Sequence, residues 1–154
     1  MARYRRLFVP GGTYFFTVCL AVRGGDLLVR EVGALREAVR ATRAERPFGI
    51  GAFVVLPDHL HCVWTLPEGD SDYPVRWRLI KARFSRAVPM AERRPSQIAR
   101  RERGVWQRRY WEHVVRDEDD YARCVAYCWT NPVKHGFVAE PKDWRWSSFH
   151  RDNP

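Results

Sequence analysis

Two apolar segments near the middle of the chain constrain the fold more than any other feature. Residues 50–56 and 61–66 are rich in β-branched and aromatic side chains, and the turn-forming pair Pro57-Asp58 lies between them. Segments of this length and composition are typical of buried strands. The pattern therefore predicts an antiparallel hairpin. A further strand is predicted at residues 13–20, directly after the turn pair Gly11-Gly12.

The other periodic segments predict three helices and a short strand. Apolar side chains recur at helical spacing over residues 28–45 and 74–88. A third helix is predicted from the acidic run 117–120 to about Asn131, where the following proline favours extended backbone. Residues 110–115 are predicted to form a short strand or loop.

The order of these elements predicts the fold class. Strand, helix, two strands, helix, short strand and helix favour an α+β fold, namely a ferredoxin-like antiparallel sheet with packed helices. The chain has 154 residues and shows no repeat or linker, so residues 1–154 are predicted to form a single domain.

The charge balance indicates a polyanionic partner. Lys and Arg total 27 against 18 Asp and Glu, which gives a net charge of +9 and favours nucleic acid or an anionic membrane surface. Arginine suits phosphate recognition, although an arginine-rich composition also follows from a GC-rich genome. The sequence has no transmembrane-length apolar run and no signal-peptide core, so we expect a cytoplasmic protein with reduced thiols.

His59-Leu60-His61 is the sharpest motif in the sequence. Residues two apart in a strand point to the same face, so both imidazoles are expected to project together while Leu60 enters the core. Two neutral imidazoles on one face are half of a metal site. The alternative is a hydrogen-bonded pair of surface histidines. The apolar residues on either side favour the metal site, because two polar rings within an otherwise apolar segment are more easily explained by a ligand that binds them.

The third predicted helix offers partners for this pair. Tyr127 and Asn131 are one turn apart, at the margin of the apolar stripe that contains Cys124 and Cys128. A phenol and a carboxamide at this spacing can reach one site. A phenol has a pKa of about 10, so Tyr127 as a nucleophile needs a metal that polarises the electrophile. The alternative is a half-buried packing tyrosine.

Two further groups have competing interpretations. The four-residue spacing of Cys124 and Cys128 occurs at zinc sites, but thiols on an apolar stripe usually behave as small hydrophobic groups. Asp58 precedes His59 and either orients that ring or serves only as a turn residue.

The chain resembles the single-tyrosine HUH transposases, and most closely the REP-associated tyrosine transposases of bacteria. The resemblance covers nearly the whole chain. It is carried by Tyr4-Arg5-Arg6, residues 11–18, residues 54–67, residues 106–113, Tyr127 and residues 131–136.

The resemblance implies a role for each of four residues. His59 and His61 correspond to the HUH pair on a central strand, Asn131 to the third metal ligand, and Tyr127 to the nucleophile. The implied metal is Mg²⁺ or Mn²⁺, and the implied substrate is single-stranded DNA beside a REP-like palindromic hairpin. Cleavage would leave a 5′-phosphotyrosine, and reversal of the step would rejoin DNA. The resemblance also favours a monomer and a nucleoid-associated protein.

Basic and aromatic side chains elsewhere are candidates for contact with this DNA. Arginines along a hairpin stem would bind phosphates in a salt-dependent, sequence-independent manner. Trp106, with Tyr110 and Trp111, is expected either to stack on unpaired bases or to belong to the core. The basic candidates lie in an N-terminal arm, in the second helix and in the segment that follows it: Arg3, Arg5, Arg6, Arg76, Arg78, Lys81, Arg83, Arg100, Arg101, Arg103, Arg108 and Arg109.

Two other functions compete with a DNA strand transferase. One is a domesticated palindrome-binding protein whose chemistry is idle, and the other is a basic RNA-binding ferredoxin-like domain. The RNA-binding domain would show an aromatic RNP signature, which residues 53–56 do not provide. A pure binding protein has no need of two histidines, a tyrosine and an asparagine together, so the enzyme is favoured.

Overall fold

The computed structural model describes residues 6–89 and 92–154. A four-stranded antiparallel sheet forms its centre, with the strands in the order β2-β3-β1-β4. In chain order the elements are β1 (Thr13–Cys19), α1 (Leu27–Arg30), α2 (Val32–Glu45), β2 (Gly49–Val55), β3 (His59–Thr65), α3 (Tyr73–Ala87), α4 (Pro95–Ala99), β4 (Trp111–Val114), α5 (Glu118–Lys134), η1 (Pro141–Asp143) and α6 (Phe149–Asp152).

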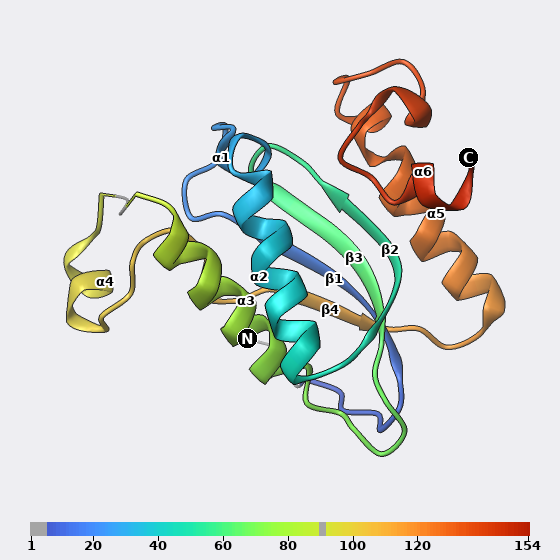
Figure 1. Cartoon of the computed structure of the whole chain (residues 1–154), viewed down its shortest axis with the longest axis horizontal. Coiled ribbons are helices and arrows are strands. Elements are labelled where there is room, and N and C mark those ends of the chain that lie inside the picture. The colour runs from blue at the N-terminus through green and yellow to red at the C-terminus, as the bar shows by residue number, and fades with distance from the viewer. Residues whose placement is uncertain (1–5, 90–91) are drawn as a thin grey trace, which may run out of the picture.

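The arrangement confirms the predicted fold class. The strand order and the β-α-β-β-α-β succession are those of a ferredoxin-like sheet, and β3, which carries both histidines, lies between β2 and β1. Helices α2 and α3 pack together over one face of the sheet, whereas α5 contacts β2 and β3 from the other side (Figure 1). The short helix α4 lies at the opposite end of the molecule from α5.

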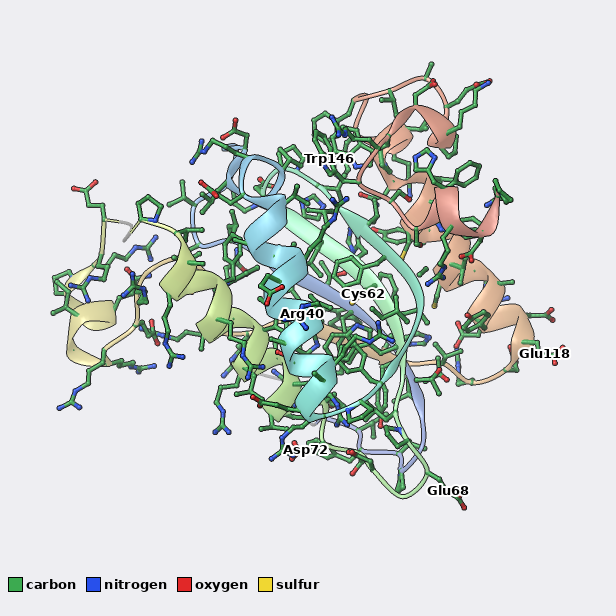
Figure 2. All side chains as sticks on the ribbon, in the orientation of Figure 1. Arg40, Cys62, Glu68, Asp72, Glu118 and Trp146 are labelled. Atoms are coloured by element: carbon green, nitrogen blue, oxygen red, sulfur yellow. The ribbon has the colours of Figure 1, made fainter. Side chains whose placement is uncertain are left out.

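The larger core lies between the sheet and the α2–α3 layer. Leu60, Cys62 and Trp64 of β3 point into it and are fully buried. Trp64 stacks on Trp77 of α3 with ring centroids 4.3 Å apart. Figure 2 shows Cys62 amid the packed side chains, while Glu118 projects at the periphery. Because strand side chains alternate, this burial turns the other residues of β3, including both histidines, toward α5.

The smaller core lies between α5 and the strands β2 and β3. Val54, Val63, Cys124 and Cys128 meet there. Burial raises the pKa of the Cys128 thiol well above its usual range and that of Cys124 to about 11. Both cysteines are therefore neutral packing groups, as the apolar-stripe interpretation predicts.

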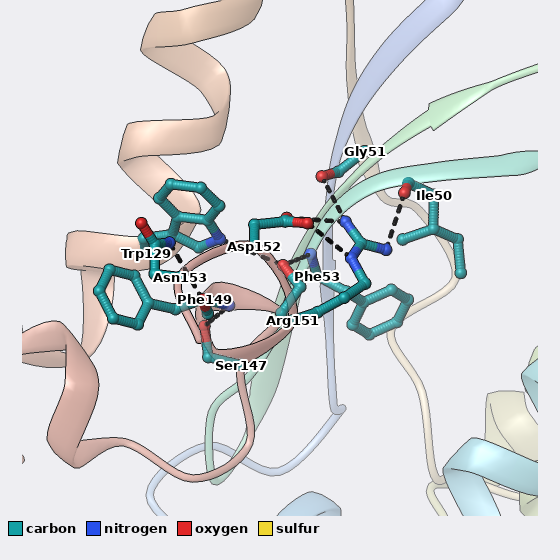
Figure 3. A network of polar contacts seen from close by, with 10 residues as sticks. Ile50, Gly51, Phe53, Trp129, Ser147, Phe149, Arg151, Asp152 and Asn153 are labelled. Atoms are coloured by element: carbon teal, nitrogen blue, oxygen red, sulfur yellow. Dashed lines mark hydrogen bonds and ion pairs between the residues drawn. The ribbon is translucent and has the colours of Figure 1, made fainter.

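The C-terminal segment covers the outer edge of β2 (Figure 3). Val54 and Ser147 form an antiparallel bridge, and the Ser148 hydroxyl accepts hydrogen bonds from the Phe53 N–H at 2.9 Å and the Trp129 indole at 3.1 Å. Further along the strand, the Arg151 guanidinium donates to backbone carbonyls of β2. These contacts occupy backbone groups that an uncovered edge strand would expose.

Three elements differ from the predictions by more than a one-residue shift of a boundary. The helix predicted over residues 28–45 is interrupted at Glu31, which separates α1 from α2. The strand predicted at 61–66 begins at His59, which places both histidines within β3. Helix α5 continues through Pro132 to Lys134. A proline removes only its own N–H, and hydrogen bonding resumes with His135 N–H to Asn131 C=O at 3.0 Å.

Among residues 6–89 and 92–154, no helix combines the length and the apolar character that crossing a membrane requires.

Candidate metal and nucleophile site

The two histidines of β3 lie side by side on the face toward α5. Their ring centroids are 5.0 Å apart, and only 6% of His59 and 3% of His61 is exposed. The Asp58 carboxylate lies 2.7 Å from Nδ1 of His59 and also accepts hydrogen bonds from the Gly24 N–H and the Arg23 guanidinium. Asp58 therefore ends the β2–β3 turn and orients the His59 ring, so both interpretations of this residue apply.

Electrostatics keep Asp58 charged and His59 neutral. Burial raises the pKa of the Asp58 carboxyl, but the hydrogen bonds from Gly24, His59 and Arg23 outweigh burial and hold that pKa well below its usual range. Burial lowers the pKa of His59, and Asp58 opposes this only in part. A charged carboxylate at Nδ1 accepts a hydrogen bond from the Nδ1–H group, which leaves the lone pair of Nε2 available for a metal.

His61 is held by neighbours on β1. Its Nδ1 lies 2.8 Å from the Thr17 hydroxyl, and its ring stacks on Phe15 at a centroid distance of 5.6 Å. Burial is the main reason that the pKa of His61 falls to about 3, and the neighbouring imidazole of His59 adds to the effect. Both β3 histidines are thus neutral near pH 7, so a metal would not have to displace their protons.

Helix α5 brings Asn131 and Tyr127 to the same place. Asn131 is 2% exposed and faces His61, yet its Oδ1 has no hydrogen-bond partner of good geometry among the described residues. The Tyr127 ring stands edge-on to His61 at 5.1 Å and to Phe15 at 5.5 Å, and 40% of Tyr127 is exposed. The structure thus brings together the four residues predicted to form one site, and the phenol remains open to solvent.

Tyr121, the other exposed tyrosine of α5, lies elsewhere. Its hydroxyl packs against Gly51 of β2, where a larger residue would collide with the phenol. Gly51 also marks the irregularity in the β2–β3 register. Tyr121 therefore serves the β2 end of the sheet and not the histidine site.

Two further side chains, for which the sequence predicts no role, also lie at this site. The His135 ring is 5.2 Å from His59, and the Lys134 ammonium lies 5.1 Å from the centroid of the Tyr127 ring. Both follow Asn131 by about one turn. The helix was predicted to end at Asn131, and this boundary excluded them.

The donor set fits a divalent metal ion. Two neutral imidazoles from β3 and an unpartnered carboxamide oxygen from α5 converge, and a buried polar atom without a partner is costly unless something binds it. A second group at the other end of α5 has ligand atoms within 4.8 Å of one another, namely His113, Asp120 and Cys124. In that group Asp120 already binds His113 at 2.8 Å and the Arg116 N–H at 2.9 Å.

The predicted DNA contacts are divided by burial. Arg76 is 1% exposed and binds the Asp70 carboxylate and the backbone carbonyls of Arg46 and Pro47. The prediction that Arg76 contacts DNA is therefore wrong, because its position on α3 faces the core and its charge is used to tie loops together. Arg83 binds Thr42 and Glu45 and thereby links α3 to α2.

Several other candidates also hold neighbouring segments in place. The Lys81 ammonium donates to the Gln107 carbonyl, and the Trp106 indole packs on Phe84 and donates to the Lys81 carbonyl. Three more arginines bind partners within the protein: Arg6 with Glu112, Arg103 with the Ser85 carbonyl, and Arg108 with Glu102.

Four of the remaining basic candidates are free to meet a ligand. Arg78, Arg100, Arg101 and Arg109 are exposed. Arg3 and Arg5 lie outside the described residues. Arg109 also lines a hollow of about 590 Å³ whose wall includes Thr17, the partner of His61. Thr17 places this hollow next to the histidine site, on the part of the same sheet face that α5 does not cover.

Comparison with known proteins identifies the family. Over 152 residues the chain is 46% identical to the REP-associated tyrosine transposase of Escherichia coli (strain K12), a match that covers 99% of this chain and 85% of that protein. The chain belongs to the REP-associated tyrosine transposases. A proposed REP-associated tyrosine transposase of Haemophilus influenzae is 44% identical over 154 residues, covering 99% of this chain and 88% of that protein. No protein-family model matches the chain.

Two solved structures resemble the chain. A REP-associated tyrosine transposase bound to a REP hairpin matches with a TM-score of 0.85 and 46% identity, over 99% of this chain and 85% of that one. A proposed transposase from Deinococcus radiodurans matches with a TM-score of 0.52 and 17% identity, over 82% of this chain and 95% of that one, and shows a shared fold. The family is one of transposases, so at this level the chain is a DNA-processing protein.

Proposed function

We propose that the chain is a metal-dependent single-stranded DNA endonuclease and strand transferase that acts on palindromic hairpin DNA through a 5′-phosphotyrosine intermediate. One observation carries the proposal. An accessible phenol stands edge-on to a neutral, buried histidine, beside a second histidine and an unpartnered carboxamide oxygen. A packing tyrosine needs none of these neighbours, whereas a phenol that attacks a phosphate needs an electrophile activated next to it.

The bond changes in this reaction balance without an energy source. The Tyr127 oxygen forms a bond to the scissile phosphorus while the bond from phosphorus to the 3′-oxygen breaks. The phenol loses its proton and the 3′-oxygen gains one. One phosphodiester is replaced by another, so attack by a 3′-hydroxyl on the phosphotyrosine rejoins DNA by the reverse step.

His59, His61 and Asn131 would hold the metal ion, which we propose to be Mg²⁺ or Mn²⁺. A carboxamide oxygen combined with phosphate oxygens favours a hard ion. When bound, the ion supplies Lewis-acid polarisation of the phosphate. Asp58 and Thr17 orient the two imidazoles through Nδ1, and Phe15 packs against both His61 and Tyr127.

The same fold suits hairpin DNA with a single-stranded flank. The family member of known structure binds a REP hairpin, and we propose the same class of partner for this chain. Exposed arginines such as Arg78, Arg100 and Arg101 would contact stem phosphates. The hollow beside Thr17 would receive the flank. We propose that the protein acts as a monomer, since the C-terminal segment occupies the outer edge of β2.

A covalent-adduct assay tests the proposal. A labelled hairpin oligonucleotide with a single-stranded flank is incubated with the protein and Mg²⁺, with EDTA as the control. We expect a protein–DNA band that resists denaturation and depends on the metal. Specific hairpin binding without any adduct would contradict the proposed chemistry and would favour the palindrome-binding protein.

A further inference from the structure

We propose that Lys134 positions Tyr127 and neutralises the charge that develops on the scissile phosphate during attack. This inference rests on the proposed function, because it assigns a role within the same reaction. The Lys134 ammonium lies over the Tyr127 ring, 5.1 Å from its centroid. No other cation lies over that ring among residues 6–89 and 92–154.

The helix geometry explains how Lys134 reaches the tyrosine. Residues seven apart on an α-helix lie almost on the same line along its surface, and helical side chains lean toward the N-terminus. Lys134 therefore extends back over Tyr127, and Asn131 occupies the turn between them. The three side chains form one stripe of nucleophile, candidate metal ligand and cation.

The charge of Lys134 is uncommitted in the described part of the chain. The other two lysines bind partners within the protein, because Lys142 lies 3.1 Å from Glu140 and Lys81 donates to the Gln107 carbonyl. Among the residues that the structure describes, Lys134 has no carboxylate within 4 Å. It is exposed and stands beside the phenol that a phosphate would approach.

The chemistry gives a cation at this position a purpose. As the Tyr127 oxygen bonds to phosphorus, the phosphate carries close to two negative charges before the 3′-oxygen leaves, and it returns to one charge in the phosphotyrosine diester. The phenolic proton passes to water, and the 3′-oxygen takes a proton from water. A fixed cation that gains interaction only as the second charge appears lowers the barrier without tightening ground-state binding.

A simpler role for Lys134 is stabilisation of the helix end. A lysine in the last turn interacts favourably with the helix dipole and the free carbonyls. That role affects folding and would leave the rate constant of adduct formation at saturating DNA unchanged. The two roles are therefore separable by measurement.

The test measures the rate constant of adduct formation in a single turnover, with saturating hairpin oligonucleotide and Mg²⁺. We expect Lys134→Ala to slow the step by about 10²-fold, as when one electrostatic interaction with a transition state is removed, with hairpin affinity changed by less than about threefold. Lys134→Arg should recover most of the rate. Lys142→Ala is the matched control and should behave as the wild type.

Sulfur substitution of the scissile phosphate sharpens the test. If Lys134 contacts one non-bridging oxygen, one phosphorothioate stereoisomer should slow the wild type but cause no further loss in Lys134→Ala, a non-additive result. Additive losses with both stereoisomers would overturn the contact.

The wild-type reaction separates the two possible failures. A Tyr127-dependent adduct that Lys134→Ala forms at the wild-type rate would overturn the role of Lys134 and leave the proposed function intact. Absence of any adduct with the wild type would overturn both.

Discussion

The two ends of α5 each bring a histidine together with helix side chains, but their polar atoms are satisfied differently. Near the N-terminal end, the Asp120 carboxylate is hydrogen-bonded to His113, to the Arg116 N–H and to the Cys124 thiol. The guanidinium groups of Arg116 and Arg123 each lie 3.8 Å from it. The Asp120 carboxylate is thus fully engaged within the protein. Such a cluster joins β4 to α5 without a ligand.

Near the C-terminal end of α5, one buried polar atom is left without a hydrogen-bond partner among the described residues. His59 and His61 are tied through Nδ1, and the Asn131 oxygen has no partner of good geometry among the described residues. The contrast teaches that a histidine beside a carboxyl or amide does not by itself mark a reaction centre. A candidate ligand site differs from a completed network in two ways: neighbouring residues orient its histidines, and at least one buried polar atom that faces them has no partner within the protein.

Removing the Tyr127 hydroxyl should have the largest effect. Tyr127→Phe is expected to abolish cleavage and the covalent adduct while hairpin binding survives, because the ring still packs against His61 and Phe15. Denaturing gels with labelled hairpin measure the adduct, and mobility shifts measure binding. Tyr121→Phe is the control on the same helix. Normal adduct formation by the Tyr127 variant would place the nucleophile elsewhere.

Histidine substitutions test the comparison itself. His59→Ala or His61→Ala should reduce cleavage by at least about 10²–10³-fold and weaken Mn²⁺ binding, because each removes a proposed ligand. His113→Ala should lower thermal stability and leave both cleavage and Mn²⁺ affinity near wild type. Calorimetric titration with Mn²⁺ provides the affinity. If His113→Ala lost the ion while His59→Ala kept it, the two ends of α5 would have been assigned in the wrong order.

Salt dependence separates DNA binding from both clusters. Arg100→Ala with Arg101→Ala should reduce the slope of log affinity against log salt by up to about 0.9 for each phosphate that the variant no longer neutralises. The bond that is cut should not change, since neither arginine is in the site. Arg40→Ala, which removes an exposed arginine paired with Glu37 on α2, is the control. An unchanged slope in the double variant would remove these arginines from the DNA interface.

Acid titration gives the smallest effect. The pKa of His61 is about 3 and that of His59 is also lowered, in both cases chiefly by burial. A folded-state pKa below the unfolded value of about 6.5 contributes stability above that pH, and this stability is lost as the pH falls toward 3. Relative to the wild type, His61→Gln should therefore lose less thermal stability between pH 6.5 and 4.

Asp120 provides the contrast in pH window. Its pKa is lowered by the hydrogen bond from the Arg116 backbone and then by His113. Its contribution to stability is present above the unfolded pKa of about 3.9 and is lost at more acidic pH. Asp120→Asn should therefore lower the melting temperature above about pH 4, and its difference from the wild type should shrink only below that pH. An equal effect of the two variants between pH 6.5 and 4 would contradict these assignments.

The sequence predicted the fold well because its signals are local. The turn at Pro57-Asp58 and the β-branched runs around it specify the central hairpin, and the alternation within His59-Leu60-His61 specifies which face the imidazoles take. The i, i+4 spacing of Tyr127 and Asn131 placed both on one helix stripe. The roles proposed for these two residues come from the family resemblance, because spacing alone left them open.

The errors arose where tertiary contacts decide. Pro132 predicted a helix end, but Pro132 is buried within α5 and the helical hydrogen bonding continues beyond it to His135, so Lys134 and His135 were not expected near the site. The sequence does not distinguish Arg76 from the exposed arginines of α3, yet Arg76 is buried and binds Asp70 and two loop carbonyls. The lack of a hydrogen-bond partner for the Asn131 oxygen likewise cannot be predicted from sequence, because it depends on which groups the fold places around that oxygen.

The most direct test of the central claim is to identify the residue that becomes linked to DNA. The wild-type adduct is trapped on a labelled hairpin oligonucleotide with Mg²⁺, digested with nuclease and protease, and sequenced by tandem mass spectrometry. We predict one modified peptide, with a nucleotide joined through phosphate to Tyr127. Attachment at Tyr121 or at any residue near His113 would contradict the assignment of the reaction centre to the C-terminal end of α5.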